Sequence, residues 1–94
     1  MANIEKFTRK ELRGMGVGLK PTIHIGKDGL TENVVTELKN QIKINKVVKV
    51  KVLAASLDRK REIAEELASR SGTKLVEIRG STILVCDPRH YQGD

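Results

Sequence analysis

The sequence predicts a compact α/β domain of three helices and four strands, in the order α-β-α-β-α-β-β. Three observations favour this class. Three segments carry apolar residues at helical spacing, four short segments are rich in β-branched residues, and turn residues separate them. The 94 residues suffice for one domain with a modest core. We expect a single domain over residues 1–94, with its core at about 8–86 and short tails at both ends.

The first helix is expected to begin at Thr8. Thr8 and Glu11 have the spacing of a capping box, in which each side chain satisfies a free backbone N–H. Leu12, Met15 and Leu19 continue an apolar stripe at helical spacing. Glycines at alternate positions weaken the helix and should end it near Val17.

A strand, a helix and a second strand are expected next. Pro21 fixes the entry to a strand over Thr22–Ile25. Apolar residues at i+4 steps predict a helix over Thr31–Ile44. Lys46–Val52 is the clearest strand of the chain, because Val48, Val50 and Val52 face one way and Lys49 and Lys51 the other.

A third helix is expected to be capped by Asp58 or Ser56 and ended by Ser71-Gly72. Its buried face should consist of Ile63, Ala64, Leu67 and Ala68. Two strands, over Lys74–Ile78 and Thr82–Cys86, then flank a short turn and should pair as an antiparallel hairpin.

The four strands should form one mixed sheet. Two β-α-β crossovers make the first three strands parallel if they share a sheet, and the hairpin reverses the fourth. Both alternating sets of the fourth strand, Ile83 with Val85 and Leu84 with Cys86, are apolar. Both of its faces therefore need cover, and the first helix is the candidate for the second face.

The charge of the chain is unevenly distributed. The formal net charge is +6, and all of it lies in residues 1–51, while residues 52–94 are neutral. Such a basic half is a plausible electrostatic footprint for a polyanion, although many small domains are basic without binding nucleic acid. Phe7 and Tyr91 are the only aromatic residues. Recognition of backbone and shape is therefore favoured over base stacking.

Other function classes find little support. No apolar run approaches the ~20 residues that span a bilayer, so no membrane partner is expected. The single cysteine, Cys86, cannot form an internal disulfide, which indicates a reducing cytoplasm. His24 and His90 lack an evident catalytic partner, and Cys86, Asp87 and His90 make a poor metal site. We expect neither an enzyme nor a cofactor, and we favour a monomer.

The most informative segment joins the first strand to the second helix. It reads Gly26-Lys27-Asp28-Gly29, a Gly-x-x-Gly core that holds a lysine. Glycine lets backbone N–H groups approach an anion closely, and the start of a helix favours negative charge. We therefore predict that this loop contacts nucleic-acid phosphate, with Lys27 adding a point charge. Asp28 and Glu32 oppose this by placing negative charge beside the site.

Three stretches together carry a family resemblance: Leu19-Lys20-Pro21, Ile25–Glu32 and the Val-Lys-Val-Lys strand at 48–51. Combined, they resemble a YhbY-like protein, the stand-alone form of the CRM domain (chloroplast RNA splicing and ribosome maturation). The likeness spans roughly residues 8–86. It implies an α/β fold similar to the C-terminal domain of translation initiation factor three. It also implies RNA binding through the Gly-x-x-Gly loop, and association with precursors of the large ribosomal subunit.

The residues expected to contact RNA are the loop and the basic positions around it. The full set is Gly26, Lys27, Asp28, Gly29, Lys20, Arg9, Lys10, Arg13, Lys39 and Lys43. The chain departs from the family pattern at Ser71-Gly72, at an extra Arg79, and at the ending Val85–Pro88. Two alternatives stay open: a protein that binds duplex DNA or chromatin, and an adaptor whose apolar sheet face docks a protein.

Overall fold

The computed structural model describes residues 4–93, so residues 1–3 and 94 of the expected domain lie outside it. Its elements are β1 (Phe7–Thr8), α1 (Arg9–Val17), β2 (Ile23–Ile25), α2 (Glu32–Ile42), β3 (Val47–Val52), the 3₁₀ helix η1 (Ala54–Arg59), α3 (Lys60–Ser71), β4 (Lys74–Arg79), β5 (Thr82–Cys86), the 3₁₀ helix η2 (Pro88–His90) and β6 (Tyr91–Gly93). Within residues 4–93, no helix has the length and apolar character needed to cross a membrane. The predicted α/β class is confirmed.

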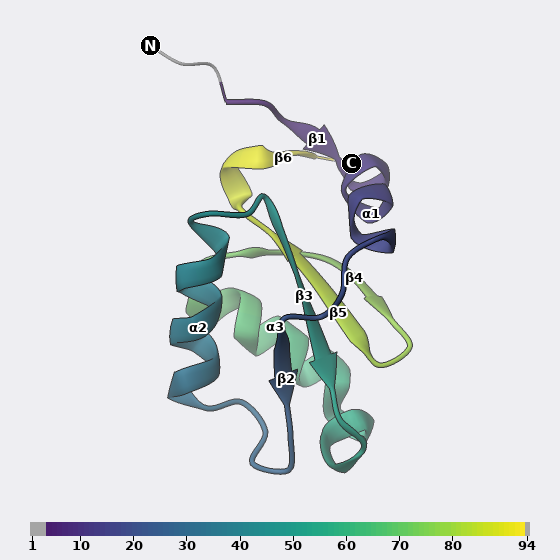
Figure 1. The fold of residues 1–94 in the computed structure, drawn as a ribbon, viewed down its shortest axis with the longest axis vertical. Helices are drawn as coiled ribbons and strands as arrows, with labels where there is room; N and C mark the ends of the chain where they lie inside the picture. The colour runs from purple at the N-terminus through teal and green to yellow at the C-terminus, as the bar shows by residue number, and fades with distance from the viewer. Residues whose placement is uncertain (1–3, 94) are drawn as a thin grey trace.

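The main sheet has four strands in the order β2-β3-β5-β4 (Figure 1). β2 and β3 are parallel, and β5 is antiparallel to both of its neighbours, β3 and β4. In chain order, β2, β3 and β4 therefore run the same way and β5 is reversed, as predicted. The hairpin places β5 between β3 and β4, which makes β2 and β4 the two edge strands.

Helices α2 and α3 cover one face of this sheet. Their apolar stripes meet the alternate, inward-facing residues of the strands, and the largest buried side chains reach 0% exposure. Burial of one such aliphatic side chain contributes about 1.5–3 kcal/mol, so this layer holds most of the stability. The predicted buried face of α3 is confirmed. The core consists of Ile23, Ile25, Val35, Leu38, Val48, Val50, Val52, Ile63, Ala64, Leu67, Ile83 and Val85.

Helix α1 covers part of the opposite face, as the apolar pattern of β5 predicted. Leu12 of α1 is fully buried in a second cluster with Val76, Leu84 and Cys86. Gly16 lies directly against β5, because a Cβ there would come within 2.7 Å of Leu84 Cδ2. The absence of a side chain at this position therefore lets the helix and the strand approach closely.

The ends of the helices agree with the sequence in some places and differ in others. The capping box of α1 is present: Glu11 N–H donates to Thr8 Oγ1 at 3.2 Å, and Thr8 N–H donates to Glu11 Oε1 at 2.8 Å. Helix α2 ends at Ile42 rather than at Ile44, because the chain turns there and leaves Ile44 85% exposed.

The predicted cap of the third helix is wrong. Asp58 and Ser56 lie inside η1, and α3 begins after Arg59 with no side-chain cap. The 3₁₀ turn of η1 leads directly into the α-helix, so the N-terminal cap position falls on a residue that cannot accept a hydrogen bond through its side chain.

The two ends of the chain form a small sheet that the sequence did not reveal. β1 and β6 pair in parallel, with Phe7 opposite Tyr91. The Tyr91 ring lies under two cations, with Arg9 Cζ 5.6 Å and Lys74 Nζ 4.8 Å from its centroid. The segment expected to be a C-terminal tail therefore packs on the start of α1 through residue 93 (Figure 1).

Candidate functional site

The Gly-x-x-Gly loop, residues 26–29, joins β2 to α2 at the lower end of the molecule in Figure 1. The Gly29 N–H donates to the Gly26 carbonyl at 3.0 Å and closes a tight turn. Gly29 has a φ of +68°, a left-handed conformation that costs other residues roughly 1–2 kcal/mol. Lys27 and Asp28 occupy the exposed tip between the two glycines.

The loop is held from one side by the segment that follows β3. The buried Ser56 hydroxyl of η1 donates to the Gly26 carbonyl at 2.7 Å. Just before η1, the Leu53 N–H donates to the carbonyl of Ile25 at 2.8 Å. These two hydrogen bonds fix the segment after β3 to the loop. Ser56 therefore connects η1 to the loop and does not cap a helix.

Backbone donors at the exposed tip of the loop remain available. The Gly29 N–H is used inside the turn, but within residues 4–93 the N–H groups of Lys27 and Asp28 have no protein acceptor. At the start of α2, the Thr31 hydroxyl accepts from the Val34 N–H at 3.3 Å and satisfies one donor of the first turn. An anion at the loop could thus accept hydrogen bonds from two amides and from the Lys27 ammonium.

Arg59 is a cation at this site that the sequence analysis missed. Its Nη2 atom lies 3.6 Å from the position that a Cβ on Gly29 would occupy, so the guanidinium lies over the loop. It reaches the loop because β2 and β3 are parallel neighbours whose carboxyl ends meet at one edge of the sheet. The predicted parallel pairing of these two strands could have revealed Arg59, because it places the residues after Val52 beside Gly26.

One of the two acidic groups beside the loop has a cation as its partner. Glu32 forms an ion pair with Arg70 of α3, with 2.9 Å between Oε1 and Nη2. Asp28 stays exposed at the tip of the loop. The carboxylate of Glu32 thus pairs with Arg70, while Arg59 lies over the turn and Lys27 is exposed at its tip.

The second half of the candidate surface is the part of the sheet face that α1 leaves open. Lys49 and Lys51 of β3 lie on this face, because the alternate valines point into the core. The Lys49 ammonium donates to the carbonyls of Gly16 and Leu19, at 3.0 and 3.3 Å. The Lys51 ammonium donates to Ser81 Oγ at 2.5 Å. These hydrogen bonds connect both lysines to neighbouring segments and place their ammonium groups on this face.

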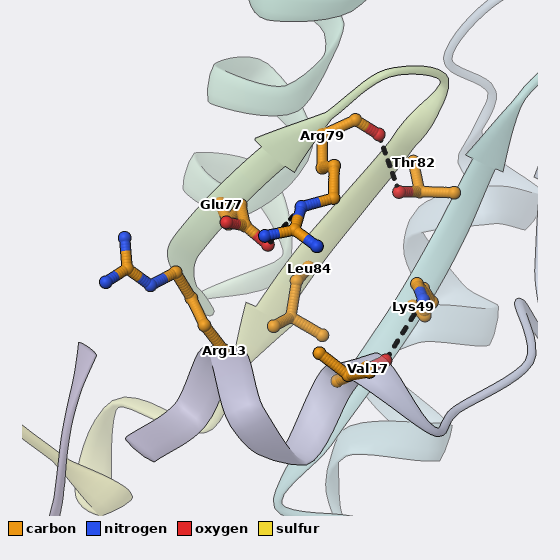
Figure 2. A pocket seen from close by; sticks show the side chains of 8 residues that line it. Arg13, Val17, Lys49, Glu77, Arg79, Thr82 and Leu84 are labelled. Carbon is orange, nitrogen blue, oxygen red and sulfur yellow. Dashed lines mark hydrogen bonds and ion pairs between the residues drawn. The ribbon is translucent and has the colours of Figure 1, made fainter. Parts of the chain in front are cut away.

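A small hollow lies on this face between the C-terminal half of α1 and the β4–β5 hairpin (Figure 2). Arg13, Lys49 and Arg79 line it together with Glu77, whose carboxylate lies 3.7 Å from the Arg79 guanidinium. The cavity measures about 20 Å³, which is enough for a water molecule but not for a nucleotide. It adds positive charge to the surface and is not itself a ligand pocket.

The other predicted contact residues are dispersed. Arg9 is engaged inside the fold, because its guanidinium donates to the Val76 carbonyl at 2.5 Å and to the Tyr91 hydroxyl at 3.1 Å. Lys39 and Lys43 are exposed near the C-terminal end of α2, which points away from the loop (Figure 1). Lys20 is exposed on the α1–β2 connection, and Lys10 and Arg13 are exposed on α1.

The titratable groups with perturbed environments lie away from the loop. Burial raises the pKa of the Cys86 thiol to about 11, and the neighbouring Asp87 carboxylate adds to this effect. The Asp87 carboxyl has a pKa below its usual range, because Arg89 donates hydrogen bonds to it. Among residues 4–93 no three metal-ligating side chains cluster.

Comparison with known proteins places this loop and sheet in a described family. The CRS1/YhbY (CRM) domain matches residues 4–85. The chain is 34% identical to Probable RNA-binding protein PA4753 of Pseudomonas aeruginosa, over 82% of this chain and 74% of that protein. It is 36% identical to Probable RNA-binding protein MJ0652 of Methanocaldococcus jannaschii, over 86% of this chain and 61% of that protein.

A solved structure has the same fold. The hypothetical protein SAV1595 of Staphylococcus aureus, for which RNA binding has been proposed, superposes with a TM-score of 0.73. It is 31% identical in sequence and covers 83% of this chain and 81% of its own. The chain described here belongs to the CRS1/YhbY (CRM) domain family.

Proposed function

We propose that this protein binds RNA through the Gly-x-x-Gly loop. The observation that carries the proposal is the pair of N–H groups at Lys27 and Asp28, which have no acceptor within residues 4–93. They lie on the exposed turn that bears Lys27, with the Arg59 guanidinium over it. Amides and cations arranged in this way complement a phosphate oxygen. The relatives PA4753 and MJ0652, each named Probable RNA-binding protein, support RNA as the source of that phosphate.

Recognition is proposed to act mainly on the RNA backbone. Phe7 and Tyr91 both lie in the small β1–β6 sheet, and Tyr91 is already flanked by two cations. Neither ring is presented as a free stacking platform beside the loop. The open sheet face, with Lys49, Lys51 and Arg79, extends the positive surface away from the loop.

The RNA is proposed to be ribosomal RNA in precursors of the large ribosomal subunit, as the family resemblance implies, and the protein is proposed to act in the cytoplasm. Crosslinking in cells, followed by mapping of the bound RNA, tests this assignment. Crosslinks concentrated on large-subunit ribosomal RNA in assembling particles are expected. Crosslinks spread evenly over messenger RNA would contradict it.

The fold bears on one of the two alternative functions, and an experiment separates the other. An adaptor with an open apolar sheet face is disfavoured, because helices cover the apolar parts of both faces. Competition between a structured ribosomal RNA and duplex DNA, at several salt concentrations, separates RNA binding from DNA binding. We expect the RNA complex to win and to weaken steeply with salt, because phosphate contacts release counterions. A preference for duplex DNA, or a complex insensitive to salt, would contradict the proposal.

A further inference from the structure

From the surroundings of the loop we infer that its ligand is an unpaired nucleotide, with the base resting on Leu53 and Leu57. The inference rests on the proposed RNA binding and adds the kind of RNA segment that enters the site. It assigns a function to η1, a segment that sequence analysis treated only as the start of a helix.

Leu53 is exposed beside the loop, and Leu57 lies four residues further along, in η1. Leu53 is 41% exposed and Leu57 is 37% exposed, and neither belongs to an apolar core cluster within residues 4–93. Leu53 Cδ1 lies 3.9 Å from the position that a Cβ on Gly26 would occupy, so this apolar surface begins at the loop itself. Ser56, between the leucines in the chain, fixes this segment to the Gly26 carbonyl.

The arrangement matches the two chemical parts of a nucleotide. The Lys27 and Asp28 amides, with the Lys27 and Arg59 side chains, are suited to the phosphate. The exposed Leu53 side chain beside the loop, continued along η1 by Leu57, offers an apolar surface to the flat face of a base. The groups suited to a phosphate and the apolar surface suited to a base therefore lie on two connected segments, the loop and the segment after β3 that includes η1.

This ligand must be unpaired. In a duplex the faces of each base are stacked on their neighbours and cannot lie on a protein surface. Aliphatic side chains also carry no donors or acceptors to read base edges. The site should therefore prefer single-stranded segments, such as loops or bulges of a folded RNA, with little preference among bases.

The test compares a labelled single-stranded RNA of mixed sequence with the same RNA annealed to its complement. We expect the wild-type chain to bind the single strand at least tenfold more tightly. The double variant Leu53→Ser/Leu57→Ser should lose tenfold or more of its affinity for the single strand and keep its affinity for the duplex. Ile44→Ser, which changes an 85% exposed residue just beyond the end of α2, is the matched control and should leave both affinities unchanged.

Each result separates this inference from the proposal beneath it. Equal binding of single strand and duplex, or a leucine variant that binds the single strand like wild type, overturns the unpaired-nucleotide site. If Lys27→Glu nevertheless lost RNA binding, the proposed function of the loop would still be supported. Failure of the wild-type chain to bind either RNA overturns both. Because both leucines are partly exposed, circular dichroism of the double variant should match that of wild type.

Discussion

Gly16 lies where α1 crosses β5, and its missing side chain sets how closely the two elements approach. Gly14, on the same helix, is exposed, and a Cβ there would meet no atom within 4 Å. Replacing the two glycines should therefore change the free energy of unfolding in opposite directions, although both have the same low intrinsic helix propensity.

Replacing each glycine by alanine should separate these roles. Gly16→Ala forces a methyl group against Leu84 and should lower the free energy of unfolding by about 1–3 kcal/mol. Gly14→Ala should raise it by about 0.5–1 kcal/mol, because alanine restricts the unfolded chain and favours the helix. Urea denaturation measures both. Equal effects of the two substitutions would contradict close packing at Gly16.

The Cys86 thiol should be protected in the folded protein. Its pKa of about 11 lies well above the ordinary value, so the reactive thiolate at pH 8 is reduced by roughly 100-fold, and burial limits access further. A chromogenic disulfide reagent should react slowly in buffer and rapidly in denaturant. Since the folded state retains the proton, stability should fall as the pH rises from about 8.5 toward 11, and a Cys86→Ala variant should lack this fall. Rapid reaction of the native protein at pH 8 would contradict the buried position.

At the scale of elements, Arg9 joins α1 to β4 and to the C-terminal segment. Its guanidinium reaches two carbonyls of β4 next to an irregularity between Leu75 and Glu77, and it also contacts Tyr91. A side chain used in this way holds the fold, whereas its neighbour Lys10 is simply exposed.

Arg9→Ala should therefore lower the free energy of unfolding by about 1–3 kcal/mol, the scale of hydrogen bonds to a charged group. Lys10→Ala should change it by no more than about 0.5 kcal/mol, as exposed substitutions usually do. Thermal unfolding followed by circular dichroism compares the two variants. A wild-type melting temperature for Arg9→Ala would show that these contacts do not stabilise the fold.

The main elements could be predicted because each has a strong local signal. The capping box at Thr8, the apolar i+4 steps of α2 and the alternation of β3 depend on neighbours in the chain. β1 and β6 are only two and three residues long, and they form through pairing between opposite ends of the chain. No local pattern marks such a strand. The sequence predicts the start of a helix within η1, because a 3₁₀ turn and an α-helix share similar local preferences.

At the scale of the whole molecule, the sheet divides the predicted contact residues. The loop lies at the carboxyl end of β2, whereas Lys43 follows the far end of α2 and Arg9 packs beside β4 (Figure 1). The loop itself could be predicted, since its glycines and lysine are contiguous. Arg59, Leu53 and Leu57 could be placed beside it only by combining the parallel pairing of β2 and β3 with the course of the chain after β3.

The most direct test of the central claim is the affinity of charge-reversal variants for a structured ribosomal RNA, measured over a range of salt concentrations. Lys27→Glu and Lys43→Glu change the net charge equally, one at the loop and one at the far end of α2. We expect Lys27→Glu to lose about tenfold or more in affinity and to reduce the log–log salt slope by about 1, with similar losses on different RNA sequences. Lys43→Glu should lose less than about threefold, through long-range charge alone. If Lys27→Glu bound as tightly as wild type, or if both variants lost affinity equally, the loop would not be the phosphate-binding site.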